Sequence, residues 1–81
     1  MYKAEDIKRR IEELHHMTHL RQMDIIEGVV KKMYDNGLSS MEFSIEEDFL
    51  ELSIIHVIDE AGFSAEHLGD RVYRLYITEE V

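Results

Sequence analysis

The chain of 81 residues contains no cysteine and no proline, and only four of its residues are glycine. The absence of cysteine excludes disulfides, thiolate metal ligands and a thiol nucleophile, and it favours the cytoplasm over an oxidising compartment. Long apolar runs are also absent, since no stretch approaches the ~20 apolar residues of a membrane span. The polar start of the chain, residues 1–6, is unlike a signal peptide. We therefore expect an unprocessed, soluble cytoplasmic protein with no membrane insertion.

Positive charge is missing from the middle of the chain. No lysine or arginine lies between Lys32 and Arg71, a stretch that carries ten acidic side chains. Bases and acids balance over residues 1–36, so the net charge of −9 comes entirely from the remainder of the chain. A field of one sign repels nucleic acid and membrane surfaces. We therefore expect the partner to be another protein with a cationic or neutral surface, and we expect no direct contact with nucleic acid.

The length of the chain predicts a single small domain, residues 1–81. A domain of this size buries only about 60–65% of the surface that its unfolded chain exposes, so its margin of stability is thin. Association with a second copy is one way to increase that margin.

Residues 4–36 are predicted to form one long helix. Gly28 is the only glycine of this segment, and Asn36-Gly37 supplies a signal for its end. At 1.5 Å per residue such a helix spans about 50 Å, whereas a globule of 81 residues has a radius of gyration of about 12 Å. Either the helix breaks near residues 15–19, with Thr18 as a cap, or it is continuous and its far half packs on another subunit. We favour the continuous helix, because nothing local forces a break.

The rest of the chain predicts an α+β fold with a small sheet. Residues 38–45 alternate apolar and polar side chains and predict a strand, and residues 71–78 predict another. Residues 46–61 fit either a helix, with Ser44 and Glu47 as a capping box, or a strand, and the end signals favour the helix. Residues 64–69 are interpreted as a loop or one helical turn. The expected order is thus helix, strand, helix or strand, strand, with a two- or three-stranded sheet packed on the long helix and completed by dimerisation.

The long helix also carries a partial set of metal ligands. Glu12, His15 and His19 lie on one helix face at spacings of three and four residues. Zinc requires three or four ligands, and di-iron sites require two Glu-x-x-His motifs on separate helices, so neither set is complete. A solvated or interface-lining histidine patch that responds to pH is the simpler interpretation. We expect no cofactor, and we retain metal binding as the least favoured alternative.

No motif for nucleophilic, phosphate-binding or acid–base catalysis is recognisable in the sequence, so we do not expect an enzyme. The favoured function is a protein-binding regulator, adaptor or inhibitor that acts as a homodimer through the long helix. The residues expected at the self-association contact are Met17, Leu20, Ile25, Val29 and Met33. The alternative is a phage-type inhibitor whose acidic half mimics nucleic acid. The residues expected on that partner-binding acidic surface are Glu42, Glu46, Glu47, Asp48, Glu51, Asp59 and Glu60.

Overall fold

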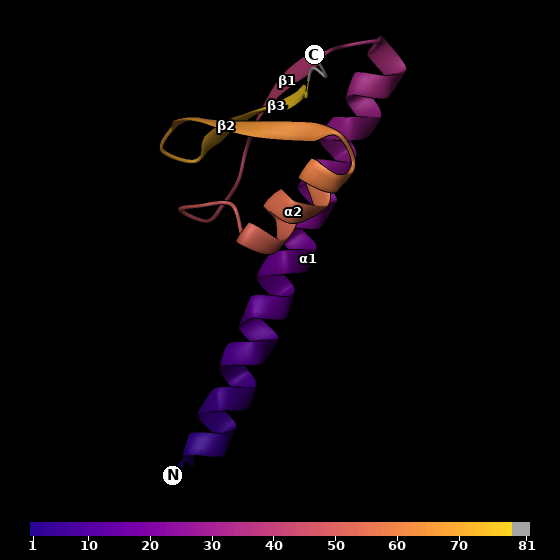
Figure 1. The fold of residues 1–81 in the computed structure, drawn as a ribbon. Coiled ribbons are helices and arrows are strands. Elements are labelled where there is room, and N and C mark those ends of the chain that lie inside the picture. Colours follow the sequence, from indigo (N-terminus) through magenta and orange to yellow (C-terminus); the bar gives the residue numbers. More distant parts are fainter. Residues whose placement is uncertain (79–81) are drawn as a thin grey trace.

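The structure, a computed structural model, describes residues 1–78 and has the α+β fold expected from the sequence (Figure 1). The elements follow one another as α1 (Ala4–Asn36), β1 (Ser40–Ser44), α2 (Leu52–Glu60), β2 (Phe63–Gly69) and β3 (Val72–Ile77). The three strands form one antiparallel sheet in the order β1-β3-β2. The sheet, α2 and the second half of α1 together make a body at one end of the molecule, and the first half of α1 extends away from it (Figure 1).

Helix α1 is continuous over 33 residues, as predicted, and no break occurs near Thr18. At its start the backbone N–H of Lys3 donates a hydrogen bond to the Asp6 carboxylate at 3.0 Å. At its end Gly37 adopts a left-handed conformation with φ of 63°, and the N–H of Leu38 donates to the carbonyl of Met33 at 2.9 Å. This closing pattern favours glycine, because a side chain is strained at positive φ.

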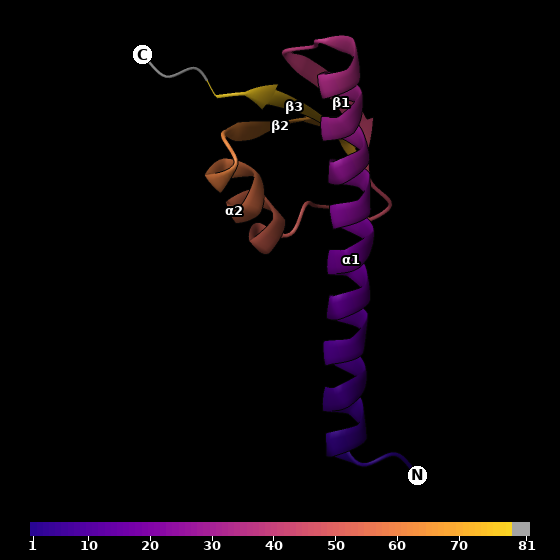
Figure 2. The same cartoon turned by 90° about the vertical axis from the view of Figure 1, so that its right-hand side faces the viewer.

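The long helix determines the shape of the molecule, which measures 54 × 23 × 22 Å. Its radius of gyration is 15.3 Å, whereas a compact chain of this length has one of about 12 Å. Figure 2 shows the reason: the first turns of α1 have no other element beside them.

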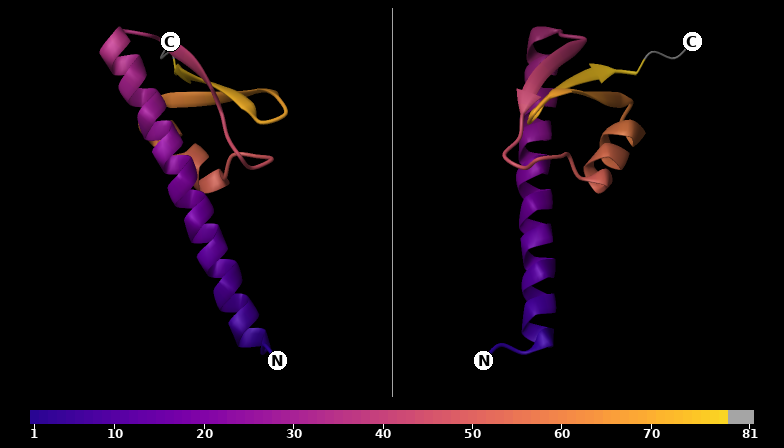
Figure 3. Two further views of the ribbon diagram at one scale, coloured as in Figure 1. Left: turned by 180° about the vertical axis from the view of Figure 1, so that it is seen from behind. Right: turned by 90° about the vertical axis from the view of Figure 1, so that its left-hand side faces the viewer.

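Strand β3 is the centre of the sheet, with β1 and β2 as its edges. The paired residues Met41 and Leu75, and next to them Phe43 and Tyr73, lie on the face that the helices cover. On the opposite face Arg74 forms an ion pair with Glu66 and lies over the Tyr76 ring. Both helices therefore pack on one side of the sheet and leave the other side open (Figure 3).

Two local expectations need correction. Residues 64–69 belong to strand β2 and are not a loop or a helical turn. The pairing with β3 through the Gly69-Asp70 turn supplies the hydrogen bonds that favour the strand, although residues such as Glu66 have low strand propensity. The helix within residues 46–61 is confirmed, but it begins only at Leu52 with Glu51 as its N-cap, so no capping box of Ser44 and Glu47 starts it.

One core holds these layers together. Ile54 and Leu75 are fully buried, and Ile58 is almost so. Ile26, Val29 and Met33 of α1, together with Phe43, Ile45, Leu50 and Tyr73, complete the same cluster. All the α1 members come from its second half. Neither helix in the described part of the chain has an apolar segment long enough to cross a membrane.

Candidate protein-interaction surfaces

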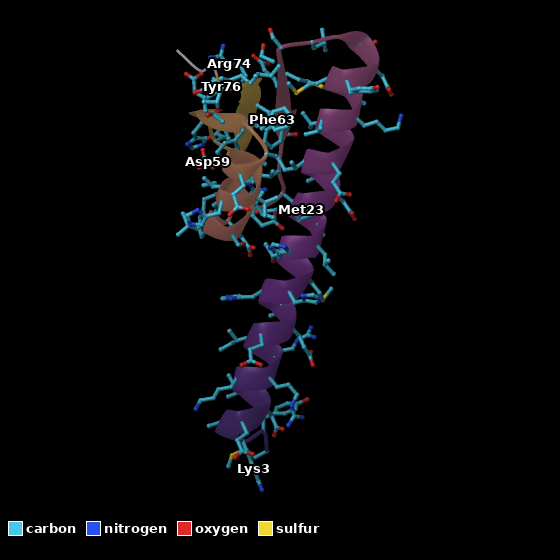
Figure 4. The ribbon with its side chains drawn as sticks, turned by 45° about the vertical axis from the view of Figure 1, so that its right-hand side comes forward. Lys3, Met23, Asp59, Phe63, Arg74 and Tyr76 are labelled. Atoms are coloured by element: carbon cyan, nitrogen blue, oxygen red, sulfur yellow. The ribbon has the colours of Figure 1, made fainter. Side chains whose placement is uncertain are left out.

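The projecting half of α1 carries large apolar side chains that nothing in the chain covers. Ile7, Ile11, Leu14, Met17 and Leu20 are each between 45% and 54% exposed. In Figure 4 the side chains between Lys3 and Met23 stand out from α1, and no other element lies against most of this segment. Isolated exposed apolar residues are ordinary, but a row of them on one element marks an interaction surface.

The five residues expected at the self-association contact divide between this surface and the core. Met17 and Leu20 lie on the exposed half of α1. Ile25 is partly buried against the core, and Val29 and Met33 are 6% and 4% exposed within it. Val29 and Met33 are covered by the chain's own sheet and α2, so they are not available to a second copy. The available contact residues lie nearer the N-terminus than the sequence suggested.

The division follows from the rotation of the apolar stripe around the helix. At 3.6 residues per turn, the stripe of Ile7, Ile11 and Leu14 is turned by about 60° from the face that Gln22, Ile26 and neighbouring residues bury. The first apolar stripe therefore lies on a different side of the helix from the buried face, and it also lies beyond the end of the body.

Several acids of the expected partner-binding surface are engaged within the chain. Glu47 accepts hydrogen bonds from Arg21 at 3.2 and 3.3 Å and one from Gln22 at 3.4 Å. Asp48 forms an exposed ion pair with Arg71, and Glu51 lies 3.5 Å from the His19 ring.

The remaining members of that acidic set lie apart from one another. Glu42 is opposite Arg74 in the β1–β3 register. Glu46, Asp59 and Glu60 are exposed and form no ion pair within residues 1–78. The seven acids are therefore spread over the sheet, the loop before α2 and the end of α2, and only part of their charge is free for a partner.

The three candidate metal ligands of the least favoured alternative are not brought together. Glu12 and His15 are exposed on the projecting helix, while Nδ1 of His19 lies 3.1 Å from Oγ of Ser53. Within residues 1–78 no group of three or more ligating side chains is arranged to hold a metal ion. His19 instead joins α1 to the start of α2, next to Glu51.

Gln22 holds the loop before α2 against α1, a role that the sequence analysis missed. Its side chain is fully buried, and its Oε1 accepts a hydrogen bond from the Glu51 N–H at 2.9 Å. Its Nε2 donates to the Phe49 carbonyl at 3.2 Å and to Glu47. The available signal was its position, because Gln22 precedes Ile26 and Val29 on the buried face by one and two turns.

A second apolar feature lies on the body, between α1, α2 and the start of β2. It is a groove of about 440 Å³, and its lining includes Met23, Val30, Tyr34, Val57 and Phe63. Figure 4 shows Met23 and Phe63 on the α1 and β2 sides of this region. Its charged lining residues are Glu27 and Lys31, one of each sign.

Comparison with known proteins adds no relative: no family model matches the chain, and neither a curated protein nor a solved structure matches it.

Proposed function

We propose that this chain is a cytoplasmic, non-catalytic, protein-binding protein that acts as a homodimer and regulates, adapts or inhibits its partner. The observation that carries the proposal is the projecting half of α1, which exposes five large apolar side chains about 50% each. Burial of apolar surface stabilises association by roughly 25 cal/mol per Å², so such a surface favours a bound state.

The continuity of α1 supports association with another molecule, and a second copy of the chain is the occupant that we propose. A rigid helix cannot fold its first half back onto its own body, so the exposed stripe is covered only by another molecule. Gln22, Arg21 and His19 hold the adjoining loop against the helix, which keeps the body fixed relative to the projection.

The acidic body supports a partner of opposite or no charge. Glu46, Asp59 and Glu60 are exposed and have no ion pair in the described residues. Charges of this kind increase the rate of association with a cationic protein, and their effect falls as salt rises.

Two measurements test the proposal. Light scattering on a sizing column should give twice the monomer mass of 9.6 kDa. Affinity capture from the native host, followed by identification and by titration of the purified partner, should give binding that a triple Glu42→Gln, Asp59→Gln, Glu60→Gln variant weakens. The control is Glu5→Gln, Glu12→Gln, Glu27→Gln, a variant of equal charge change on α1, which should bind as the wild type does.

A monomer at tens of micromolar would refute the dimer. If neither the triple variant nor an Ile11→Glu variant weakens binding, the partner uses neither the acidic side chains of the body nor the apolar side chains of the first half of α1. That result would refute the proposal.

A further inference from the structure

Three of the five exposed apolar residues on the projecting half of α1, Ile7, Ile11 and Leu14, have the spacing of a coiled-coil seam. Met17 lies beside this seam, and Leu20 lies on the other side of the helix. Ala4, Ile7, Ile11 and Leu14 follow one another at alternating intervals of three and four residues, the spacing of heptad positions a and d. Ile7, Ile11 and Leu14 are 54%, 49% and 45% exposed. The next position of the seam is Thr18, which is polar and partly buried, so the apolar seam ends where the body begins.

The charges beside this seam are all positive. At 100° per residue, Lys8 lies on one side of the seam, and Lys3 and Arg10 lie on the other. The acids of the same segment fall on the opposite half of the helix; they are Glu5, Asp6, Glu12 and Glu13. In a parallel pair, Lys3 of one copy would lie beside Lys8 of the other, and like charges at these positions oppose pairing.

An antiparallel pair avoids this repulsion. With its two-fold axis between Ile11 and Leu14, each Ile11 packs against Leu14 of the other copy. At 1.5 Å per residue, Lys3 of one copy then lies about 21 Å along the helix axis from Lys8 of the other, so the like charges are kept apart.

An acidic loop of the body lies next to the end of this seam. Glu47 accepts hydrogen bonds from both Arg21 and Gln22, so the loop of residues 46–51 crosses the seam side of α1 just beyond Thr18. In the antiparallel register this loop faces the first turn of the other copy. The positive end of the helix dipole, at the first turn of α1, is attracted to carboxylates. Glu46 and Asp48 supply them, and Phe49 beside them is 70% exposed.

We propose that the occupant of the stripe is a second copy of this chain, paired antiparallel along residues 4–18 of α1, with the N-terminus of each helix against the acidic loop 46–51 of the other. The inference rests on the self-association proposed above and assigns its geometry. The two-fold symmetry uses the same surface on both copies, so the assembly closes at two. In this register the two helices overlap directly over residues 7–18, about 18 Å, which predicts a dimer that dissociates on dilution.

Self-association is tested by sedimentation equilibrium of the full chain at several concentrations, with Ile11→Glu as the variant and Arg9→Glu as the control. Both variants place a glutamate on the exposed helix, but Arg9 lies on the side away from the seam. Ile11→Glu should raise the dimer dissociation constant by roughly tenfold or more, as loss of a central apolar anchor does. Arg9→Glu should leave the dimer intact. Equal behaviour of the two variants, or a wild-type monomer throughout, would overturn the proposal.

The direction of pairing is tested with a nitroxide label on a Glu5→Cys variant, which holds the only thiol of the chain and lies on the side of the helix away from the seam. The antiparallel dimer places the two labels about 25–30 Å apart, whereas a parallel dimer places them about 15–20 Å apart. The short distance would overturn the antiparallel arrangement and leave the proposed self-association standing; absence of a dimer would overturn both. Glu46→Lys should weaken the dimer, and a dimer that it leaves unchanged argues against the contact with loop 46–51.

Discussion

Replacement of Gln22 should be among the most damaging single changes outside the apolar core. The side chain is fully buried, and it satisfies the Glu51 N–H and the Phe49 carbonyl of the loop before α2. Gln22→Leu keeps a similar side-chain volume but leaves the Glu51 N–H and the Phe49 carbonyl without their hydrogen-bond partners. Each buried polar group left without a partner costs ~1–3 kcal/mol. These two hydrogen bonds are only partly buried on the loop side, and the apolar leucine offsets part of the loss, so we expect a destabilisation of about 1–3 kcal/mol.

That loss is a large fraction of the free energy of unfolding of the whole chain. A chain of this length has a free energy of unfolding of about 4–12 kcal/mol, at ~0.05–0.15 kcal/mol per residue. Urea unfolding followed by far-ultraviolet circular dichroism measures this free energy. All variants are compared at one protein concentration, because self-association makes the measured stability depend on concentration. The matched control is Arg21→Leu, which removes an exposed ion pair to the same Glu47 and should cost about 0–1 kcal/mol. A loss below about 0.5 kcal/mol for Gln22→Leu would refute the anchoring role.

A second substitution at this position has a defined pH dependence. Gln22→Glu keeps an acceptor for the Glu51 N–H but places a carboxylate in a buried site beside Glu47. Burial and the like charge both raise the pKa of the introduced carboxyl in the folded state. The stability of this variant relative to the wild type should therefore be highest at pH near 4 and should decrease as the pH rises. A destabilisation that does not change with pH would contradict this account.

Four further substitutions test the packing and the backbone. Leu75→Ala, at the fully buried centre of β3, should cost ~2–5 kcal/mol in the same urea assay, and a smaller loss would mean that the core closes around the cavity. Tyr73→Phe removes the phenol oxygen that accepts the buried Leu50 N–H at 3.1 Å, and should cost ~1–3 kcal/mol unless water reaches that group. Gly28→Ala should stabilise the fold by ~0.5–1 kcal/mol, because a Cβ at this position of the helix meets open space. Gly37→Ala should destabilise it by about 1 kcal/mol, because an alanine is strained at a φ of 63°. Equal effects of the two substitutions would contradict the left-handed conformation at the end of α1.

Local signals along the chain were sufficient for several elements. The continuous helix over residues 4–36 followed from the absence of proline and from Asn36-Gly37, and its length alone implied that it extends beyond the body. The alternation of apolar residues predicted β1 and β3 within two residues at each end. These features depend on interactions between residues close in sequence, which is why periodicity and end signals reveal them.

Strand β2 and the start of α2 could not be predicted from local periodicity and end signals. The β2 segment has weak strand propensity and becomes a strand because β3 pairs with it through a tight turn. Helix α2 starts late because the preceding loop is tied to α1 by Gln22 and to β3 by the Tyr73 hydroxyl, which accepts the Leu50 N–H. These contacts join residues more than twenty positions apart.

The sequence by itself determined the α+β class, the long unbroken helix and the separation of charge into a neutral helical part and an acidic part, because composition and local periodicity specify them. Only the tertiary structure decided which side of α1 is buried. Val29 and Met33 face the chain's own sheet, while Ile7, Ile11 and Leu14 are left exposed, because the apolar stripe turns around the helix and the body reaches only its second half. That packing choice moves the candidate contact surface to the first half of α1.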